Sequence, residues 1–174
     1  MNNQLDLLLV NAPSRISVYH NLAPLAAVEP PVWAGLIARH CLNKEFSVQI
    51  LDAEAEGLDT ERTAHCVLDT NPRLAVFCVY GHQPSASTQC LPGASAVAQL
   101  LRGKVLTLAL GTHPSALPER TLQEEPFDFI CQGEGPHTIV ELLRHILDYN
   151  TNPAPERILW WRTPAGLVNS PIKV

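Results

Sequence analysis

The sequence predicts an α/β fold: a Rossmann-like, flavodoxin-like domain built on a five-stranded parallel sheet. Five short apolar runs alternate with five helix-compatible stretches, and the runs are apolar on both faces. Small, turn-forming residues follow several of the runs at once, as at the carboxyl ends of parallel strands. Right-handed crossovers leave few topologies, and we expect the strand order 2-1-3-4-5 with helices on both faces.

The first two strands are expected at residues 5–10 and 46–51. A polar, irregular loop follows the first strand and runs past Pro24. Pro31 then opens an apolar-faced helix over residues 32–42, because proline is well tolerated in the first turn of a helix.

The middle of the chain predicts two helices around a third strand at residues 74–80. Asp59 or Thr60 is expected to cap the helix that runs to about Asp69, and a proline ends it soon afterwards. The longer helix covers about residues 87–101, with an irregular start indicated by Pro92 and Gly93.

The last two predicted strands lie at residues 105–110 and 127–131. A short helix at 114–125 separates them, and a final helix runs from 136 to 149. We therefore expect one domain over residues 1–150. Residues 151–174 are then a linker and a β-hairpin, in which Trp160 and Trp161 need a surface to cover.

Composition excludes several classes of protein. The chain has 174 residues, a formal charge of −5 and no basic stripe, which argues against a nucleic-acid partner. No apolar run is long enough to span a membrane, and no secretory signal begins the chain, so we expect a cytoplasmic protein. The five cysteines show no metal-ligand spacing and are expected to be reduced and structural: Cys41, Cys66, Cys78, Cys90 and Cys131.

Ligands of such sheets bind beyond the carboxyl ends of the strands. Four loops should converge there: 11–13, 81–87, 111–115 and 132–135. They contain no P-loop and no nucleophile–base pair, so no catalytic residue is predicted. Ser85 and Ser87 could simply cap the following helix, and His82 or His113 could be ordinary surface histidines.

These segments resemble the cobalamin-binding domain of cobalamin-dependent radical SAM proteins. The resemblance covers about residues 5–148. Its most specific motifs are Gly111-Thr112-His113-Pro114-Ser115-Ala116-Leu117-Pro118-Glu119 and Gln132-Gly133-Glu134-Gly135. Supporting motifs are Asn11-Ala12-Pro13 after the first strand and Glu29-Pro30-Pro31 leading into Trp33-Ala34-Gly35-Leu36.

The resemblance implies a corrin ring on the carboxyl rim of the sheet, with the nucleotide tail beside strands 3 and 4. The residues implied in cofactor binding are Ala12, Pro13, Tyr80, Gly81, His82, Gln83, Ser85, Ser87, Gly111, Thr112, His113, Pro114, Ser115, Leu117, Gln132, Gly133, Glu134 and Gly135. His82 is a candidate ligand on the lower face of cobalt. Thr112 departs from the Gly-Gly pair usual in this fold.

The Asp-x-His-x-x-Gly loop of methionine-synthase-like cobalamin domains is missing after the first strand, as it is in many radical SAM relatives. The resemblance therefore implies base-off binding without that histidine. The three-cysteine cluster motif of radical generation is also missing, so S-adenosylmethionine and a 4Fe-4S cluster are expected only in an absent radical SAM domain. The leading hypothesis is the cofactor domain of a radical SAM methyltransferase-like enzyme. Alternatives are a stand-alone corrinoid carrier and a flavodoxin-like module for another nucleotide. Exposed Trp160 and Trp161 rings would favour an absent domain.

Overall fold

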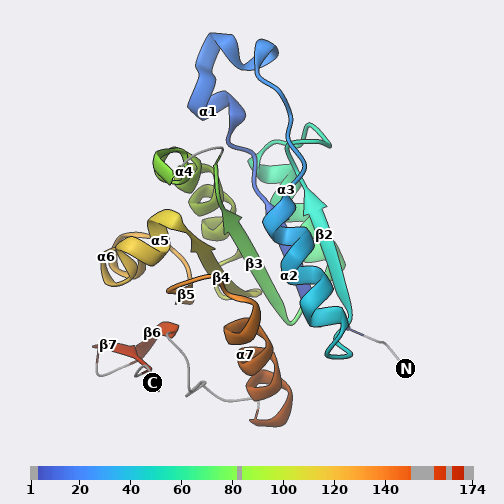
Figure 1. Cartoon of the computed structure of the whole chain (residues 1–174), viewed down its shortest axis with the longest axis vertical. Coiled ribbons are helices and arrows are strands. Elements are labelled where there is room, and N and C mark those ends of the chain that lie inside the picture. Colours follow the sequence, from blue (N-terminus) through green and yellow to red (C-terminus); the bar gives the residue numbers. More distant parts are fainter. Residues whose placement is uncertain (1–3, 82–83, 150–158, 164–165, 171–174) are drawn as a thin grey trace.

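The computed structural model describes residues 4–81, 84–149, 159–163 and 166–170. Within them a single sheet has the order β2-β1-β3-β4-β5-β6-β7, with helices on both sides (Figure 1). The first five strands pair in parallel, so the predicted order 2-1-3-4-5 is confirmed. Their bounds are Leu7–Asn11 (β1), Val48–Asp52 (β2), Leu74–Val79 (β3), Leu106–Gly111 (β4) and Phe129–Cys131 (β5).

The two faces of the sheet bury alternate side chains of the same strands. In β1, Leu7 and Leu9 join the core on one face, while Leu8 and Val10 join the core on the other. This alternation follows from the two-residue period of a strand. The first core is closed by α2 (Val32–Leu42) and α7 (Pro136–Tyr149), and the second by α3 (Thr60–Thr70), α4 (Pro84–Leu101) and α6 (Pro118–Glu124).

Three predictions about the helices are wrong. The segment expected as a loop after β1 contains α1 (Arg15–Tyr19) and a 3₁₀ helix, η1 (His20–Leu25). The helix expected at 114–125 is two helices, α5 (Thr112–Ala116) and α6, because Pro118 lacks an amide hydrogen and keeps Leu117 out of the helical region. The helix α4 begins at Pro84, three residues before its expected start, and continues through Pro92.

Asp59 caps α3, and it is one of the two residues predicted for this role. Its carboxylate accepts a hydrogen bond from the backbone amide of Arg62 at 2.8 Å. At the other end, Asn71 adopts the left-handed conformation that commonly ends a helix. Local sequence therefore determines both ends of this helix.

The C-terminal hairpin is part of the sheet. The strands β6 (Leu159–Thr163) and β7 (Gly166–Asn169) form an antiparallel hairpin, and β6 pairs with β5. The ring of Trp161 is buried in the first core, and Trp160 packs against the second. Both rings cover this chain's own sheet, so their packing gives no sign of an absent domain. Among the described residues, no helix has the length and apolar character required to cross a membrane.

Candidate functional site

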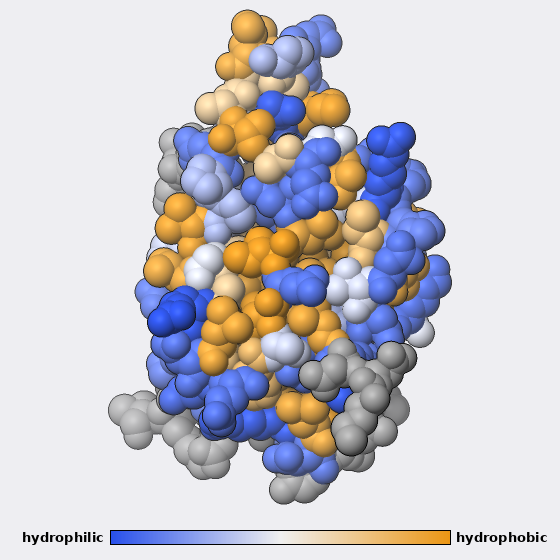
Figure 2. Space-filling view, turned by 90° about the vertical axis from the view of Figure 1, so that its right-hand side faces the viewer, coloured by the Kyte–Doolittle hydropathy of each residue, from blue (hydrophilic) through white to orange (hydrophobic). Residues whose placement is uncertain are grey.

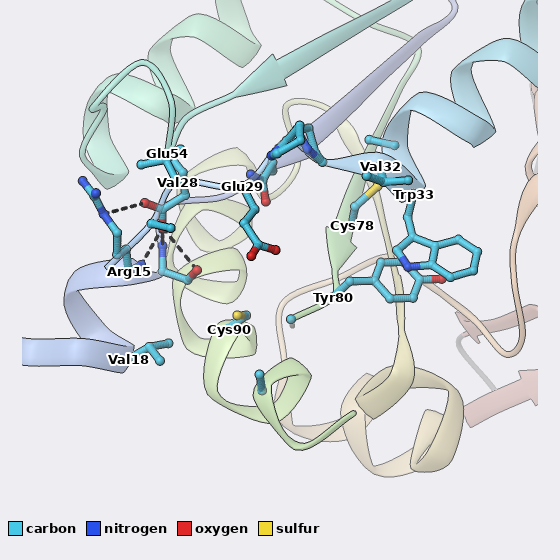
Figure 3. A pocket seen from close by; sticks show the side chains of 18 of the residues that line it. Arg15, Val18, Val28, Glu29, Val32, Trp33, Glu54, Cys78, Tyr80 and Cys90 are labelled. Carbon is cyan, nitrogen blue, oxygen red and sulfur yellow. Dashed lines mark hydrogen bonds and ion pairs between the residues drawn. The ribbon is translucent and has the colours of Figure 1, made fainter. Parts of the chain in front are cut away.

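A cavity of about 330 Å³ opens at the carboxyl ends of β1 and β3 (Figure 3). These two strands are neighbours in the sheet, but the chain leaves them for helices on opposite faces, which makes this the switch point of the fold. The walls come from the ends of β1 and β3, the turn after β2, α1, the first turn of α2 with the segment before it, and α4. The lining includes Asn11, Ser14, Arg15, Val28, Glu29, Trp33, Glu54, Cys78, Tyr80, Gly81, Ala86 and Cys90.

One wall is built around the carboxylate of Glu54, whose side chain is only 15% exposed. Its Oε1 atom accepts hydrogen bonds from the backbone amides of Ser14 and Arg15, the second at 2.5 Å. The Arg15 Nε atom lies 3.6 Å from Oε2 of the same carboxylate. Glu54 thus holds the start of α1 against the turn after β2, and its charge is compensated within the wall.

The opposite wall is aromatic. The rings of Trp33 and Tyr80 are stacked, with centroids 5.1 Å apart and an interplanar angle of 18°. Burial, together with Cys78, Cys131 and Glu134, raises the pKa of Tyr80 well above its usual range. The phenol therefore stays neutral at physiological pH, and the wall presents a flat, uncharged surface to the cavity.

Two thiols also line the cavity, from β3 and α4. Burial raises the pKa of Cys78 to about 12. Burial is also the main cause that raises the pKa of Cys90, with a further contribution from Glu54 and an opposing hydrogen bond from Ser14. Both are neutral thiols at physiological pH, as expected of structural cysteines.

The predicted site residues do not all meet at this cavity. Tyr80 and Gly81 line it, and Ala12 lines a small adjoining hollow. Pro13 lies beside α4, where a side chain on Gly93 would come within 2.2 Å of its carbonyl oxygen. A side chain on Gly81 would meet the Ala86 methyl group at 2.3 Å, so its small size serves packing.

Some predicted residues in α4 and after β4 make contacts within the fold, and others are exposed. The buried hydroxyl of Ser87 donates to the Val79 carbonyl and accepts from the His113 amide at 3.0 Å. The His113 Nδ1 atom lies 2.9 Å from the hydroxyl of Thr88. Thr112 and Pro114 belong to α5, Pro114 being buried, and Leu117 is 42% exposed between α5 and α6.

Gly111 has no room for a side chain. Its φ is +144°, and a Cβ atom would lie 2.0 Å from the Val79 carbonyl oxygen on the neighbouring strand. The absence of a side chain here is therefore required by the backbone of the sheet. A ligand tail is not needed to explain it.

The loop after β5 is held by two side-chain contacts. The Ser115 hydroxyl accepts from the Gly133 amide at 2.9 Å, and Trp160 Nε1 donates to Gln132 Oε1 at 3.2 Å. Gly133 is exposed, and a Cβ atom added to it would meet no other atom within 4 Å, whereas a Cβ on Gly135 would contact Leu110 at 3.2 Å. Glu134 is exposed and close enough to affect Tyr80 electrostatically. His82, Gln83 and the side chain of Ser85 fall outside the described part of the chain.

Sequence reasoning does not single out the residues that give the cavity its chemistry. Glu29 and Trp33 enter the sequence analysis only as parts of a motif, and Arg15 and Glu54 are not named there as candidates. Glu54 lies 40 residues from Ser14, and only folding brings the two together. The signal that could have identified Glu29 and Trp33 is the proline pair before α2, because it indicates that a helix begins there, beside the carboxyl ends of the strands.

Hydrophobic side chains also surround the outside of this region. Exposed apolar residues are concentrated in α1, η1 and α2, where Leu25 is 84% exposed and Leu36 56%. Figure 2 shows the side of the molecule on which α2 and β2 lie, with hydrophobic groups gathered in its middle and hydrophilic groups around them. The cavity thus opens from a rim that is itself partly apolar.

The fold and the cavity define a doubly wound α/β domain with a cavity at the switch point of its sheet. The family model described as the B12 binding domain matches residues 21–143. That is more than half of the chain, so this chain belongs to the B12-binding domain family, and its cofactor class is cobalamin.

Solved structures with the same fold include two enzymes. TsrM from Kitasatospora setae, a radical S-adenosylmethionine methyltransferase with cobalamin and a [4Fe-4S] cluster bound, has a TM-score of 0.71 and 17% identity. The alignment covers 97% of this chain and 31% of that one. The cobalamin-dependent radical enzyme OxsB with aqua-cobalamin bound has a TM-score of 0.68 and 16% identity, over 99% of this chain and 23% of that one. This chain thus spans less than a third of either protein. No curated protein matches it at a significant level.

Proposed function

We propose that this chain binds cobalamin on the carboxyl rim of its sheet, as the cofactor domain of a radical SAM methyltransferase-like enzyme. The cavity between the ends of β1 and β3 is the observation that carries the proposal. It lies at the switch point, where ligands of doubly wound sheets bind, and it belongs to a B12-binding domain.

The residues around the cavity suit a corrinoid. A corrin ring has broad, largely apolar faces and a periphery of amide side chains. The Trp33–Tyr80 stack offers an apolar surface, while Asn11, Glu29 and the Glu54–Arg15 pair offer polar partners. The cavity is near the lower end of the range of about 300–1,000 Å³ for drug-sized ligands. Cobalamin is larger, so it would lie across the mouth with one part inside.

We propose base-off binding without a histidine from the loop after β1. That loop reads Asn11-Ala12-Pro13-Ser14-Arg15-Ile16, and its backbone amides at Ser14 and Arg15 are occupied by Glu54. When bound, cobalamin would supply a cobalt centre able to carry a methyl group. The chain's own residues would bind and orient it, and its partner would be a radical SAM domain that holds S-adenosylmethionine and the iron–sulfur cluster.

Reconstitution tests the proposal directly. The purified chain, incubated with hydroxocobalamin and passed through a desalting column, should retain about one corrinoid per chain with a base-off visible spectrum. Val28→Trp should fill the cavity and reduce retention, because Val28 lines it from a segment outside the core. Leu25→Trp is the matched control, since Leu25 is exposed in η1 and does not line the cavity. Failure of the unmodified chain to retain corrinoid would contradict the proposal.

A stand-alone corrinoid carrier is the second candidate, and the packing of the tryptophans supports it. Trp160 and Trp161 cover this chain's own sheet and need no further domain to bury them. The two candidates differ in exchange rate. A carrier should exchange its bound corrinoid with excess free cyanocobalamin within minutes, whereas a cofactor domain should hold it for hours.

A further inference from the structure

The sheet ends at β2, whose outer edge faces no other strand in the described part of the chain. Figure 1 shows this strand at one margin of the molecule, and Figure 2 views that margin, with hydrophobic groups in its middle and hydrophilic groups around them. Natural proteins usually protect an open edge with proline, a bulge or a charged side chain. The segment Val48-Gln49-Ile50-Leu51 pairs with β1 in unbroken register and contains neither proline nor charge. The strand's one charge, Asp52 at its end, accepts a hydrogen bond from Asn11 of β1 at 2.8 Å.

Two hydrogen bonds to β1 show which backbone groups of β2 point outward. The Leu7 amide donates to the Ser47 carbonyl at 3.1 Å, and the Ala53 amide donates back to a carbonyl at the end of β1 at 3.0 Å. Residues 47 and 53 therefore face β1. Successive residues of a strand direct their backbone groups to opposite edges, so the N–H and C=O groups of Val48 and Ile50 point away from β1. These groups could form a ladder with one more strand.

The charges beside the two ends of β2 are opposite. Lys44 lies in the turn before the strand and Glu56 in the turn after it. Both are exposed, and neither forms an ion pair with another described residue. Lys44 and Glu56 are equally far from Ile50 in the sequence. An antiparallel copy of β2, related by a two-fold axis through Ile50, would bring Lys44 of each copy towards Glu56 of the other. A parallel copy in the same register would bring like charges together.

We propose that a second copy of this chain pairs with β2, so that the two sheets join into one across a two-fold axis through Ile50. The two Ile50 residues would exchange backbone hydrogen bonds. Their side chains, each 42% exposed in the single chain, would lie directly opposite each other on the same face of the joined sheet. A two-fold interface uses the same patch on both copies, which this edge satisfies in strand register and in charge. The inference goes beyond the proposed function and does not depend on corrinoid binding.

Sedimentation velocity of the whole chain across the micromolar range tests the dimer. The sedimentation coefficient should rise with concentration towards the value for two chains of 19.1 kDa. Ile50→Lys should raise the dissociation constant of the dimer at least about tenfold, because it places like charges opposite each other on the axis. Leu106→Lys is the matched control. Leu106 is 39% exposed in β4, an inner strand, so the same added charge should change the constant by no more than about twofold.

Charge reversal tests the arrangement without changing the strand itself. Lys44→Glu and Glu56→Lys should each weaken self-association at least about threefold, because each variant places like charges together at both ends of the interface. An equimolar mixture of the two variants should associate about as tightly as the unmodified chain, since every contact between unlike copies then joins opposite charges. Circular dichroism checks that each variant is folded.

Three results would each overturn the inference. The unmodified chain could stay monomeric throughout, which would leave β2 as an edge for a different partner. Folded Ile50→Lys could associate as tightly as Leu106→Lys. The mixture of the two charge-reversal variants could associate no more tightly than either variant alone, and this last comparison decides the matter even if Ile50→Lys fails to fold.

Discussion

Removing one hydroxyl from α4 should show how the rim of the sheet is held together. In Ser87→Ala, the Val79 carbonyl and the His113 amide both lose their bond to a fully buried side chain. Each neutral hydrogen bond contributes about 0.5–1.5 kcal/mol, and a buried group left without a partner costs about 1–3 kcal/mol. We therefore expect the free energy of unfolding to fall by about 2–4 kcal/mol.

The same helix supplies the control for this prediction. Ser95 is also buried in α4, but its hydroxyl has no hydrogen-bond partner among the residues that the structure describes. Ser95→Ala should change the free energy of unfolding by less than about 0.5 kcal/mol, or raise it, because it removes an unpaired polar group and favours the helix. Urea denaturation followed by circular dichroism gives both values. Equal losses in the two variants would refute the role assigned to Ser87.

Three further predictions concern the sheet and its thiols. Gly111→Ala should prevent folding or lower the urea midpoint sharply, because its φ is +144° and the Val79 oxygen blocks the new methyl group; a midpoint near that of the unmodified chain would contradict this. Trp161→Ala should lower the free energy of unfolding by about 3–5 kcal/mol in the same assay, because it empties a position in the first core. A decrease of less than about 1 kcal/mol would mean that the hairpin contributes little to stability. Burial raises the pKa of Cys78 to about 12 and of Cys131 to about 11, from 9.0. The two buried, protonated thiols therefore favour the folded state below about pH 9, and this contribution to the free energy of unfolding is lost as the pH rises through their pKa values. The urea midpoint should fall between about pH 9 and 11, and it should fall less in Cys131→Ala.

The fold could be predicted because its signals are local and repeated. Runs that are apolar at every position, such as residues 74–79, must be covered on both faces, and parallel strands with crossover helices meet that need. The split of the helix at Leu117 could also have been foreseen, since Pro118 restricts the residue before it. The helical turns at residues 15–25 carry no such signal. None of the residues in α1 is buried, and its start is held by the distant carboxylate of Glu54.

The position of the cavity was predictable, but the chemical character of its walls was not. Parallel topology alone directs attention to the ends of β1 and β3, and the cavity lies there. The character of its walls depends on side chains that are far apart in the sequence, such as Trp33 with Tyr80 and Ser14 with Glu54. Sequence patterns record which residues follow a strand, whereas the lining of a cavity depends on how loops from different strands pack together.

The small residues at the strand ends show why a motif can identify a family without locating its ligand. Gly111 and Gly81 are small because neighbouring backbone and methyl groups occupy the space, and the Ser87 hydroxyl is used to join β3 to α5. Gly133 is surrounded by open space, but its φ of +108° lies in the region that favours glycine. Conformation and packing thus explain all four of these residues without any ligand. The case for corrinoid binding therefore depends on the family match and on the cavity beside Glu29 and Trp33, and substitutions at the cavity will test it more cleanly than substitutions at the glycines.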